Sequence, residues 1–258
     1  MILIFLFVAG AIVGSFLNVC IWRLPRHESI VSPGSHCPGC DRQLSWFENV
    51  PLVSYVVLSG KCRSCGSGIS PRYPLVELLT AVLYVLAGWR FGATVQLAPA
   101  LLLIATLIVV FFIDLEHYII PNSVVLPVAV IGLVSMVAIA LTTTGPDFSS
   151  WWVYPAAGLA SSAFFFIIVL IFPKGMGMGD VKLVGMLGFF LGRAVIVGLF
   201  LGFLLGALVG VGLILAGRKG RKSRVPFGPF LSVGALVALF YGNQLLDLYL
   251  GLFTATGA

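Results

Sequence analysis

The chain has 258 residues, of which 60% are hydrophobic and only 9% are charged. A soluble globule of this length needs a polar surface that such a composition does not supply, which excludes a soluble enzyme or binding domain. The net charge is +6, but the basic residues lie between apolar stretches rather than in one stripe, so we expect no nucleic-acid partner. The composition predicts an all-α polytopic membrane protein whose partner is the lipid bilayer.

Apolar stretches recur along the whole chain. A hydrocarbon core about 30 Å thick requires roughly 20 apolar residues per helix. The first stretch, residues 1–22, has no basic residue before it and therefore predicts a membrane anchor rather than a cleavable signal peptide. The sequence predicts about eight transmembrane helices, the remaining ones at 73–89, 92–113, 123–141, 151–172, 181–192, 194–216 and 229–246, with the sixth unusually short.

The distribution of lysine and arginine predicts the orientation of these helices. If the N-terminus is outside and the helices alternate in direction, 13 of the 15 basic residues lie in cytoplasmic segments. Only Arg90 and Arg193 then lie outside. Because short cytoplasmic loops are enriched in basic residues, we expect the N-terminus outside and residues 23–72 in the cytoplasm.

The segment 23–72 is polar and contains four of the five cysteines. They form the pairs Cys37-Pro-Gly-Cys40 and Cys62-Arg-Ser-Cys65, with 21 residues between the pairs. Two such pairs can place four thiolates around one Zn²⁺ ion, with Gly39 and Gly66 expected in the turns, and a loop with so little apolar core needs a staple of this kind. The spacing predicts a zinc-ribbon-like module. Free or redox-active thiols remain an alternative, as do disulfides, although a reducing cytoplasm disfavours the latter.

We therefore divide the chain into a first transmembrane helix at 1–22, a cytoplasmic four-cysteine module at 23–72 and a membrane domain at 73–258. Within the seventh predicted helix, glycines recur every four residues and predict a face for close helix packing, formed by Gly198, Gly202, Gly206 and Gly210.

Two aspartates stand beside predicted membrane helices. Asp114 ends an apolar run, and Asp180 follows the glycine-rich segment 175–179; the alternating topology places both at the cytoplasmic edge. Two carboxylates brought within a few ångströms cannot both ionise easily, so they share one proton, as the hydrolysis of a peptide by water requires. Gly177 and Gly179 would allow a substrate strand to approach closely. The simpler alternative is that each acid caps a helix or pairs with a lysine.

Several motifs in order resemble the bacterial type IV prepilin peptidases, a family of membrane aspartyl proteases with a G-x-G-D motif. They include Gly14-Ser-Phe-Leu-Asn-Val19, the paired cysteines, Ile69-Ser-Pro-Arg-Tyr-Pro-Leu-Val-Glu-Leu78, Asp114 with Ile120-Pro121, Gly177-Met-Gly-Asp180-Val-Lys182 and Pro226-Phe-Gly-Pro-Phe230. The family commonly has an acid after Ile-Pro, where this chain has Asn122.

The resemblance implies that Asp114 and Asp180 are the catalytic pair of an aspartic endopeptidase in the bacterial inner membrane. Its substrates would be prepilins or pseudopilins of type IV pili or type II secretion, cleaved where a short basic leader meets a hydrophobic helix. Many members also methylate the new N-terminus with S-adenosylmethionine, although the chain has no readable motif for that donor. Lys182 would belong to the active-site loop, either favouring ionisation of Asp180 or marking the membrane boundary. Glu77 would contact the active region or hold two helices together.

A different class of function uses the same acids. In a proton-coupled transporter, Asp114 and Asp180 would relay protons across the membrane. A relay needs polar groups through the depth of the bilayer, however, and the predicted helices at 123–141, 151–172 and 194–216 have almost none. The positions of the acids therefore favour a protease.

Overall fold

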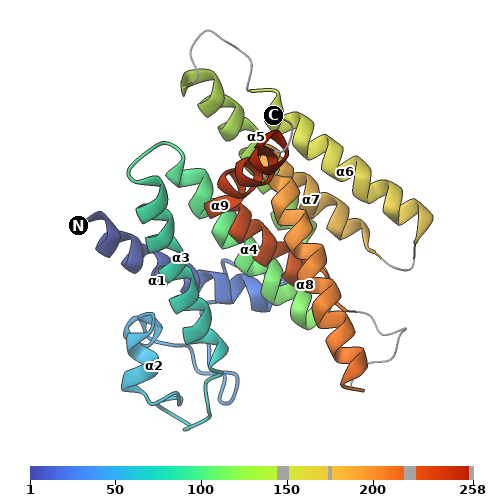
Figure 1. The fold of residues 1–258 in the computed structure, drawn as a ribbon. Coiled ribbons are helices and arrows are strands. Elements are labelled where there is room, and N and C mark those ends of the chain that lie inside the picture. The colour runs from blue at the N-terminus through green and yellow to red at the C-terminus, as the bar shows by residue number, and fades with distance from the viewer. Residues whose placement is uncertain (144–150, 174–175, 218–224, 256–258) are drawn as a thin grey trace. The chain divides into compact units, whose positions relative to one another are not determined.

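The structure is a computed structural model that describes residues 1–143, 151–173, 176–217 and 225–255. All of the regular elements in these residues are helices (Figure 1). The chain divides into two compact units, residues Met1–Leu97 and Ala98–Ala258, which are described separately below. The predicted helical class is confirmed.

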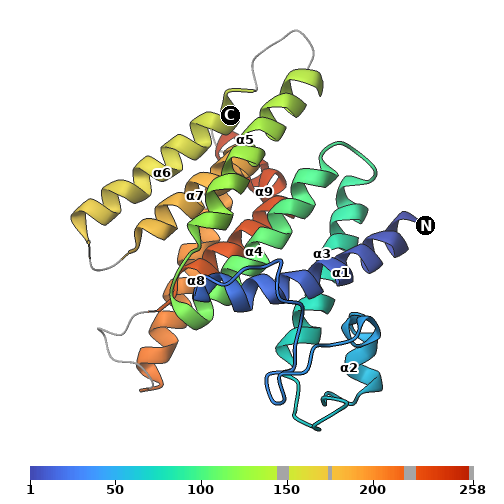
Figure 2. The same ribbon diagram turned by 180° about the vertical axis from the view of Figure 1, so that it is seen from behind.

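The first unit is a pair of long helices with the cysteine module between them in sequence. Figures 1 and 2 show α1 and α3 side by side. Their backbones approach closely because two glycines of α1 have no Cβ at the contact. A Cβ on Gly10 would lie 2.6 Å from Ala81 Cα, and one on Gly14 would lie 2.7 Å from Glu77 Cα. The elements of this unit are α1 (Ile2–Arg23), the 3₁₀ turns η1 (Leu24–Arg26) and η2 (Trp46–Asn49), α2 (Val53–Val57) and α3 (Arg72–Phe91).

The second unit is a helical bundle around α7, which lies alongside α6 in both ribbon views. Ten of the 14 residues of α7 are buried, and its side chains form much of the core. At about 1.5 Å per residue α7 is only about 21 Å long, which suits a helix enclosed by protein. The elements are α4 (Leu97–His117), α5 (Asn122–Thr143), α6 (Val153–Ile171), α7 (Met178–Leu191), η3 (Gly192–Ala194), α8 (Val195–Leu215) and α9 (Gly228–Ala255).

Seven stretches among the described residues are long and apolar enough to cross a membrane. One of them, Met178–Leu215, has 38 residues and contains both α7 and α8. The chain turns between these two helices at Gly192, whose φ of +54° is readily adopted only by glycine. The eight long helices thus agree with the predicted number, and the short sixth one is α7.

The glycine face of α8 packs against α9. A Cβ on Gly198 would meet Ala238 and Ala235 of α9, and one on Gly202 would meet Leu231 at 3.1 Å. Gly206 faces Phe230, whereas a Cβ on Gly210 would meet nothing within 4 Å. The predicted packing face therefore includes three of the four glycines.

Candidate active site and metal centre

Asp114 is held inside the second unit near the C-terminal end of α4. The apolar window predicted for this helix ended at 113, but α4 continues to His117, so Asp114 occupies its last turns. Its side chain is buried, and its Oδ2 accepts a hydrogen bond of 2.8 Å from the backbone N–H of Gly228. The start of α9 therefore fixes this carboxylate.

Asp180 lies in the first turn of α7. Gly177 is the N-cap residue, and its N–H donates a 3.1 Å hydrogen bond to Asp180 Oδ2. The carboxylate is buried and close enough to Asp114 for the two charges to interact. Asp180 thus caps its helix, which was the simpler alternative to a catalytic role. Its carboxylate also lies near that of Asp114.

The remaining residues of the predicted active-site loop have separate roles. A Cβ on Gly179 would lie 3.0 Å from Ile120 Cβ, so glycine allows α7 to begin against the segment that follows α4. Lys182 is half-buried and donates a 3.0 Å hydrogen bond to Asn122 Oδ1. The lysine therefore connects α7 to α5 through the residue at which this chain departs from the family pattern.

The contact between Gly228 and Asp114 joins residues 114 positions apart in the sequence. Phe227, directly before Gly228, packs against Phe203 and Phe165 at ring-centroid distances of 5.1 Å and 6.3 Å. This aromatic cluster holds the start of α9 in place. The sequence showed only the motif Pro226-Phe-Gly-Pro-Phe230, which carried no indication that its glycine contacts an acid.

The four paired cysteines converge in the first unit. The Sγ atoms of Cys37, Cys40, Cys62 and Cys65 all lie within 4.8 Å of one another, and no disulfide joins them. Cys37 Sγ and Cys65 Sγ are 3.7 Å apart. Four sulfurs at about 2.3 Å around a tetrahedral Zn²⁺ would be separated by roughly 3.8 Å. The cluster therefore fits a zinc ion.

The two cysteine turns have the same backbone pattern. Cys37 N–H donates to Arg42 O at 2.9 Å, and Cys62 N–H donates to Ser67 O at 2.8 Å. The residue after each second cysteine is left-handed, with φ of +58° at Asp41 and +69° at Gly66. Gly66 was expected in a turn, but Asp41 fills the equivalent place in the other pair, since aspartate tolerates this conformation.

Gly39 is small for a different reason from the one expected. A Cβ at this position would lie 2.9 Å from the side chain of Ser67 in the opposite turn.

Backbone N–H groups at Cys65 and Ser64 lower the pKa of the Cys62 thiol to about 6. The second turn thus favours a thiolate at Cys62, which is the form that binds metal.

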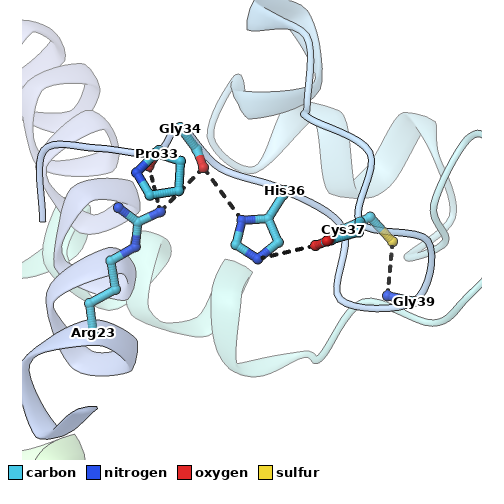
Figure 3. Close-up of polar contacts among 7 residues, drawn as sticks. Arg23, Pro33, Gly34, His36, Cys37 and Gly39 are labelled. Carbon is cyan, nitrogen blue, oxygen red and sulfur yellow. Dashed lines mark hydrogen bonds and ion pairs between the residues drawn. The ribbon is translucent and has the colours of Figure 1, made fainter. Parts of the chain in front are cut away.

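Arg23 anchors the segment before the first cysteine pair (Figure 3). Its guanidinium is buried at the end of α1 and donates to the backbone carbonyls of Ser29, Pro33 and Gly34 at 2.9, 2.7 and 3.2 Å. His36 lies beyond these carbonyls and contacts Asp41 at 3.8 Å. A single cation therefore binds three carbonyls of the loop, and the Gly34 carbonyl also lies 3.5 Å from His36 Nδ1.

We expect Arg23→Lys to loosen this loop, because an ammonium cannot reproduce the planar fork of a guanidinium. The loss of charge-assisted bonds to these partly buried carbonyls corresponds to about 1–3 kcal/mol of local opening free energy. Hydrogen exchange of the amides in residues 29–36 measures this change. The exposed neighbour Arg26, stacked on Trp22, provides the control Arg26→Lys, which should leave exchange unaltered. Equal protection in both variants would contradict the anchoring role.

Glu77 joins two elements of the first unit. Its Oε2 accepts a 2.8 Å hydrogen bond from the N–H of Leu52, the N-cap residue of α2, and Ser15 of α1 lies close to the same carboxylate. The hydrogen bond to Leu52 supports the interpretation of Glu77 as a residue that holds helices together. The acid ties α2 to a position more than one turn inside α3.

The fold and the site together define a class: a helical membrane protein in which two buried acids lie close together beside glycines, with a separate four-cysteine centre. Comparison with known families agrees with this class. Residues 8–91 match the Bacterial Peptidase A24 N-terminal domain, and residues 101–211 match the Type IV leader peptidase family.

Curated relatives match over nearly the whole chain. One from Bacillus subtilis is 36% identical and covers 95% of this chain and 96% of the relative. Others, from Pseudomonas aeruginosa and Legionella pneumophila, are each 35% identical and cover 93% of this chain and 91% of the relative. All three are named prepilin leader peptidase/N-methyltransferase. The chain belongs to the type IV leader peptidase family. No solved structure matches it.

Proposed function

We propose that this protein is a membrane aspartyl endopeptidase that removes the leader of prepilin-like proteins and then methylates the new N-terminus. The observation that carries the peptidase activity is the proximity of the buried carboxylates of Asp114 and Asp180. Family membership and the names of the relatives support both activities. A proton relay has no comparable support.

In the proposed mechanism, the two carboxylates share one proton. The ionised member accepts a proton from water as the water attacks the scissile carbonyl, and the protonated member donates a hydrogen bond to the carbonyl oxygen. In each carboxylate, Oδ2 is held by a backbone N–H, from Gly228 for Asp114 and from Gly177 for Asp180. Each Oδ1 is then the atom that handles the proton or the water.

The proposed location is the bacterial inner membrane, with the N-terminus outside and the cysteine module in the cytoplasm. The seven apolar stretches and the family support a multi-pass membrane protein. The excess of basic residues in alternate loops supports the orientation. The dyad then faces the basic leader of the substrate at the cytoplasmic edge.

Two groups complete the proposal. Zn²⁺ fits the four thiolates of the module, where it would replace the missing apolar core. S-adenosylmethionine would supply the methyl group, as the methyltransferase name of the relatives suggests.

The purified full-length protein should shorten a prepilin with a basic leader and, when given labelled S-adenosylmethionine, label the new N-terminus. An intact prepilin after incubation would contradict the peptidase proposal.

We expect Gly228→Ala to damage cleavage without preventing folding. The added Cβ would lie 2.7 Å from Asp114 Oδ2 and 3.1 Å from Asp114 Cβ, so the carboxylate must move. Displacement of a catalytic group by about 1 Å can lower the rate by about a hundredfold. The cleavage rate of a prepilin by the purified variant measures the effect.

The matched control is Gly210→Ala on α8, where an added Cβ meets nothing within 4 Å. This variant should cleave at the rate of the unaltered enzyme. Normal cleavage by Gly228→Ala would mean that the contact with Asp114 is not needed in catalysis.

A further inference from the structure

The short helix α2 of the cysteine module has its apolar side turned outward. Val53, Val56 and Val57 are spaced as i, i+3 and i+4 and therefore share one face of the helix. All three are exposed, Val56 and Val57 to 74% each. Ser54 and Tyr55 are half-buried and line the hollow between the module and the two long helices of the first unit. This arrangement is the reverse of that expected for a helix that faces water.

Two aromatic side chains extend the apolar surface. They are Trp46 and Phe47 of the turn η2, which contacts α2, and they are 80% and 43% exposed. The turn is well held, because the buried Glu48 accepts the Ser45 N–H at 2.8 Å and pairs with Arg42 at 2.6 Å. Exposed apolar surfaces of this kind mark contacts with a membrane or another protein. We define the apolar patch as Trp46, Phe47, Val53, Val56 and Val57.

The position of α2 beside α3 favours a membrane as the partner. α3 begins at Arg72 and is long and apolar enough to cross a membrane. Glu77, which accepts the Leu52 N–H at the start of α2, lies about 7.5 Å further along the helix axis. Figures 1 and 2 both show α2 beside the N-terminal part of α3. Helices at membrane surfaces insert to a depth of about 5–10 Å, so α2 lies at the level of the headgroups.

The charges next to the patch fit an anionic lipid surface. Lys61 and Arg63 are exposed in the turn of the second cysteine pair, and the Arg63 guanidinium lies 5.4 Å from the centre of the Phe47 ring. Basic side chains beside inserted apolar residues strengthen binding to anionic lipids. The module also follows one membrane-spanning stretch, α1, and precedes another, α3, so both of its ends are held at the membrane.

We propose that the apolar patch docks the cysteine module on the lipid bilayer itself. Trp46 and the valines of α2 enter the headgroup region, and Lys61 and Arg63 contact anionic lipid. Contact with lipid covers the apolar surface that the fold leaves exposed, and it fixes the height of the module at the membrane. The contact is independent of the peptidase and methyl-transfer reactions, and its test uses neither activity.

Crosslinking to lipid tests this contact. The full-length protein is reconstituted in vesicles of phosphatidylethanolamine and phosphatidylglycerol that contain a phospholipid with a photoreactive diazirine near its headgroup. Trypsin cuts after Arg42 and Lys61, so the whole patch lies in the peptide 43–61. We expect lipid adducts on this peptide as well as on the α3 peptide 73–90. Adducts on 73–90 without adducts on 43–61 would overturn the proposal and leave a protein as the occupant of the patch.

A variant of α2 tests the role of its valines. Val56→Gln combined with Val57→Gln should lower the adducts on 43–61 by about fivefold or more, because two amides are costlier than two valines to place in lipid. Adducts on 73–90 should not change. The matched control is Val31→Gln, since Val31 is 87% exposed in the same module but lies outside α2 and η2. Unchanged adducts on 43–61 in the double variant, with zinc content retained, would contradict insertion of α2.

The lipid composition tests the role of charge. Replacing phosphatidylglycerol by zwitterionic phosphatidylcholine should lower the adducts on 43–61 and leave those on 73–90 unaltered. Arg63→Gln should make this difference smaller. Adducts on 43–61 that do not depend on lipid charge would exclude Lys61 and Arg63 from the contact.

Discussion

Asp114→Asn and Asp180→Asn should each reduce prepilin cleavage by at least about a hundredfold, the lower end of the contribution of positioned acids and bases. An amide cannot take a proton from water or share one with its neighbour. The backbone bonds from Gly228 and Gly177 can be kept by the amide oxygen, so both variants should remain folded. Cleavage rates of the purified variants provide the measurement.

Asp247→Asn is the control for this pair of variants. Asp247 is on α9 and forms an exposed ion pair with Arg193 at 3.1 Å. Exposed ion pairs contribute little to stability, so this variant should cleave normally. Cleavage at the normal rate by either Asp114→Asn or Asp180→Asn would exclude the proposed dyad.

Removal of the metal should unfold the four-cysteine module. We expect about one zinc per chain, and we expect Cys37→Ser combined with Cys62→Ser to lose it. Structural zinc sites in small peptides contribute about 10–16 kcal/mol of apparent binding free energy. The module has short helices and little apolar core, so it should unfold without the ion. Metal analysis and protease sensitivity of residues 27–71 measure both effects.

Cys20→Ala provides the control for the cysteine variants. Cys20 is buried in α1 and lies outside the four-cysteine cluster. This variant should keep its zinc and its resistance to protease. A purified protein that contains no metal and keeps a stable module would refute the zinc assignment.

Much of the fold follows from local properties of the sequence. Long apolar runs predict the helices because lipid leaves the backbone few alternatives. The repeated glycines of α8 predict its packing face for the same local reason, although Gly210 lies beyond the contact with α9. The cysteine spacing also predicts convergence, since each pair needs only its own turn to bring two sulfurs together.

Contacts between distant segments could not be predicted in this way. No local pattern indicates that Gly228 donates to Asp114, because the contact depends on how α9 packs in the bundle. Arg23 appeared only as a basic residue after an apolar helix, yet its guanidinium binds three loop carbonyls. Asp41 takes a left-handed conformation in the first cysteine turn, for which the sequence indicated only Gly39 as a turn residue. The acids themselves were identified mainly through family resemblance.

The decisive measurement is an experimental structure of the membrane-embedded enzyme with a bound, uncleaved prepilin. We expect the carboxylates of Asp114 and Asp180 both to contact the scissile peptide, at one depth near the cytoplasmic surface. A peptide bound elsewhere, or packed helices between the two carboxylates, would contradict it.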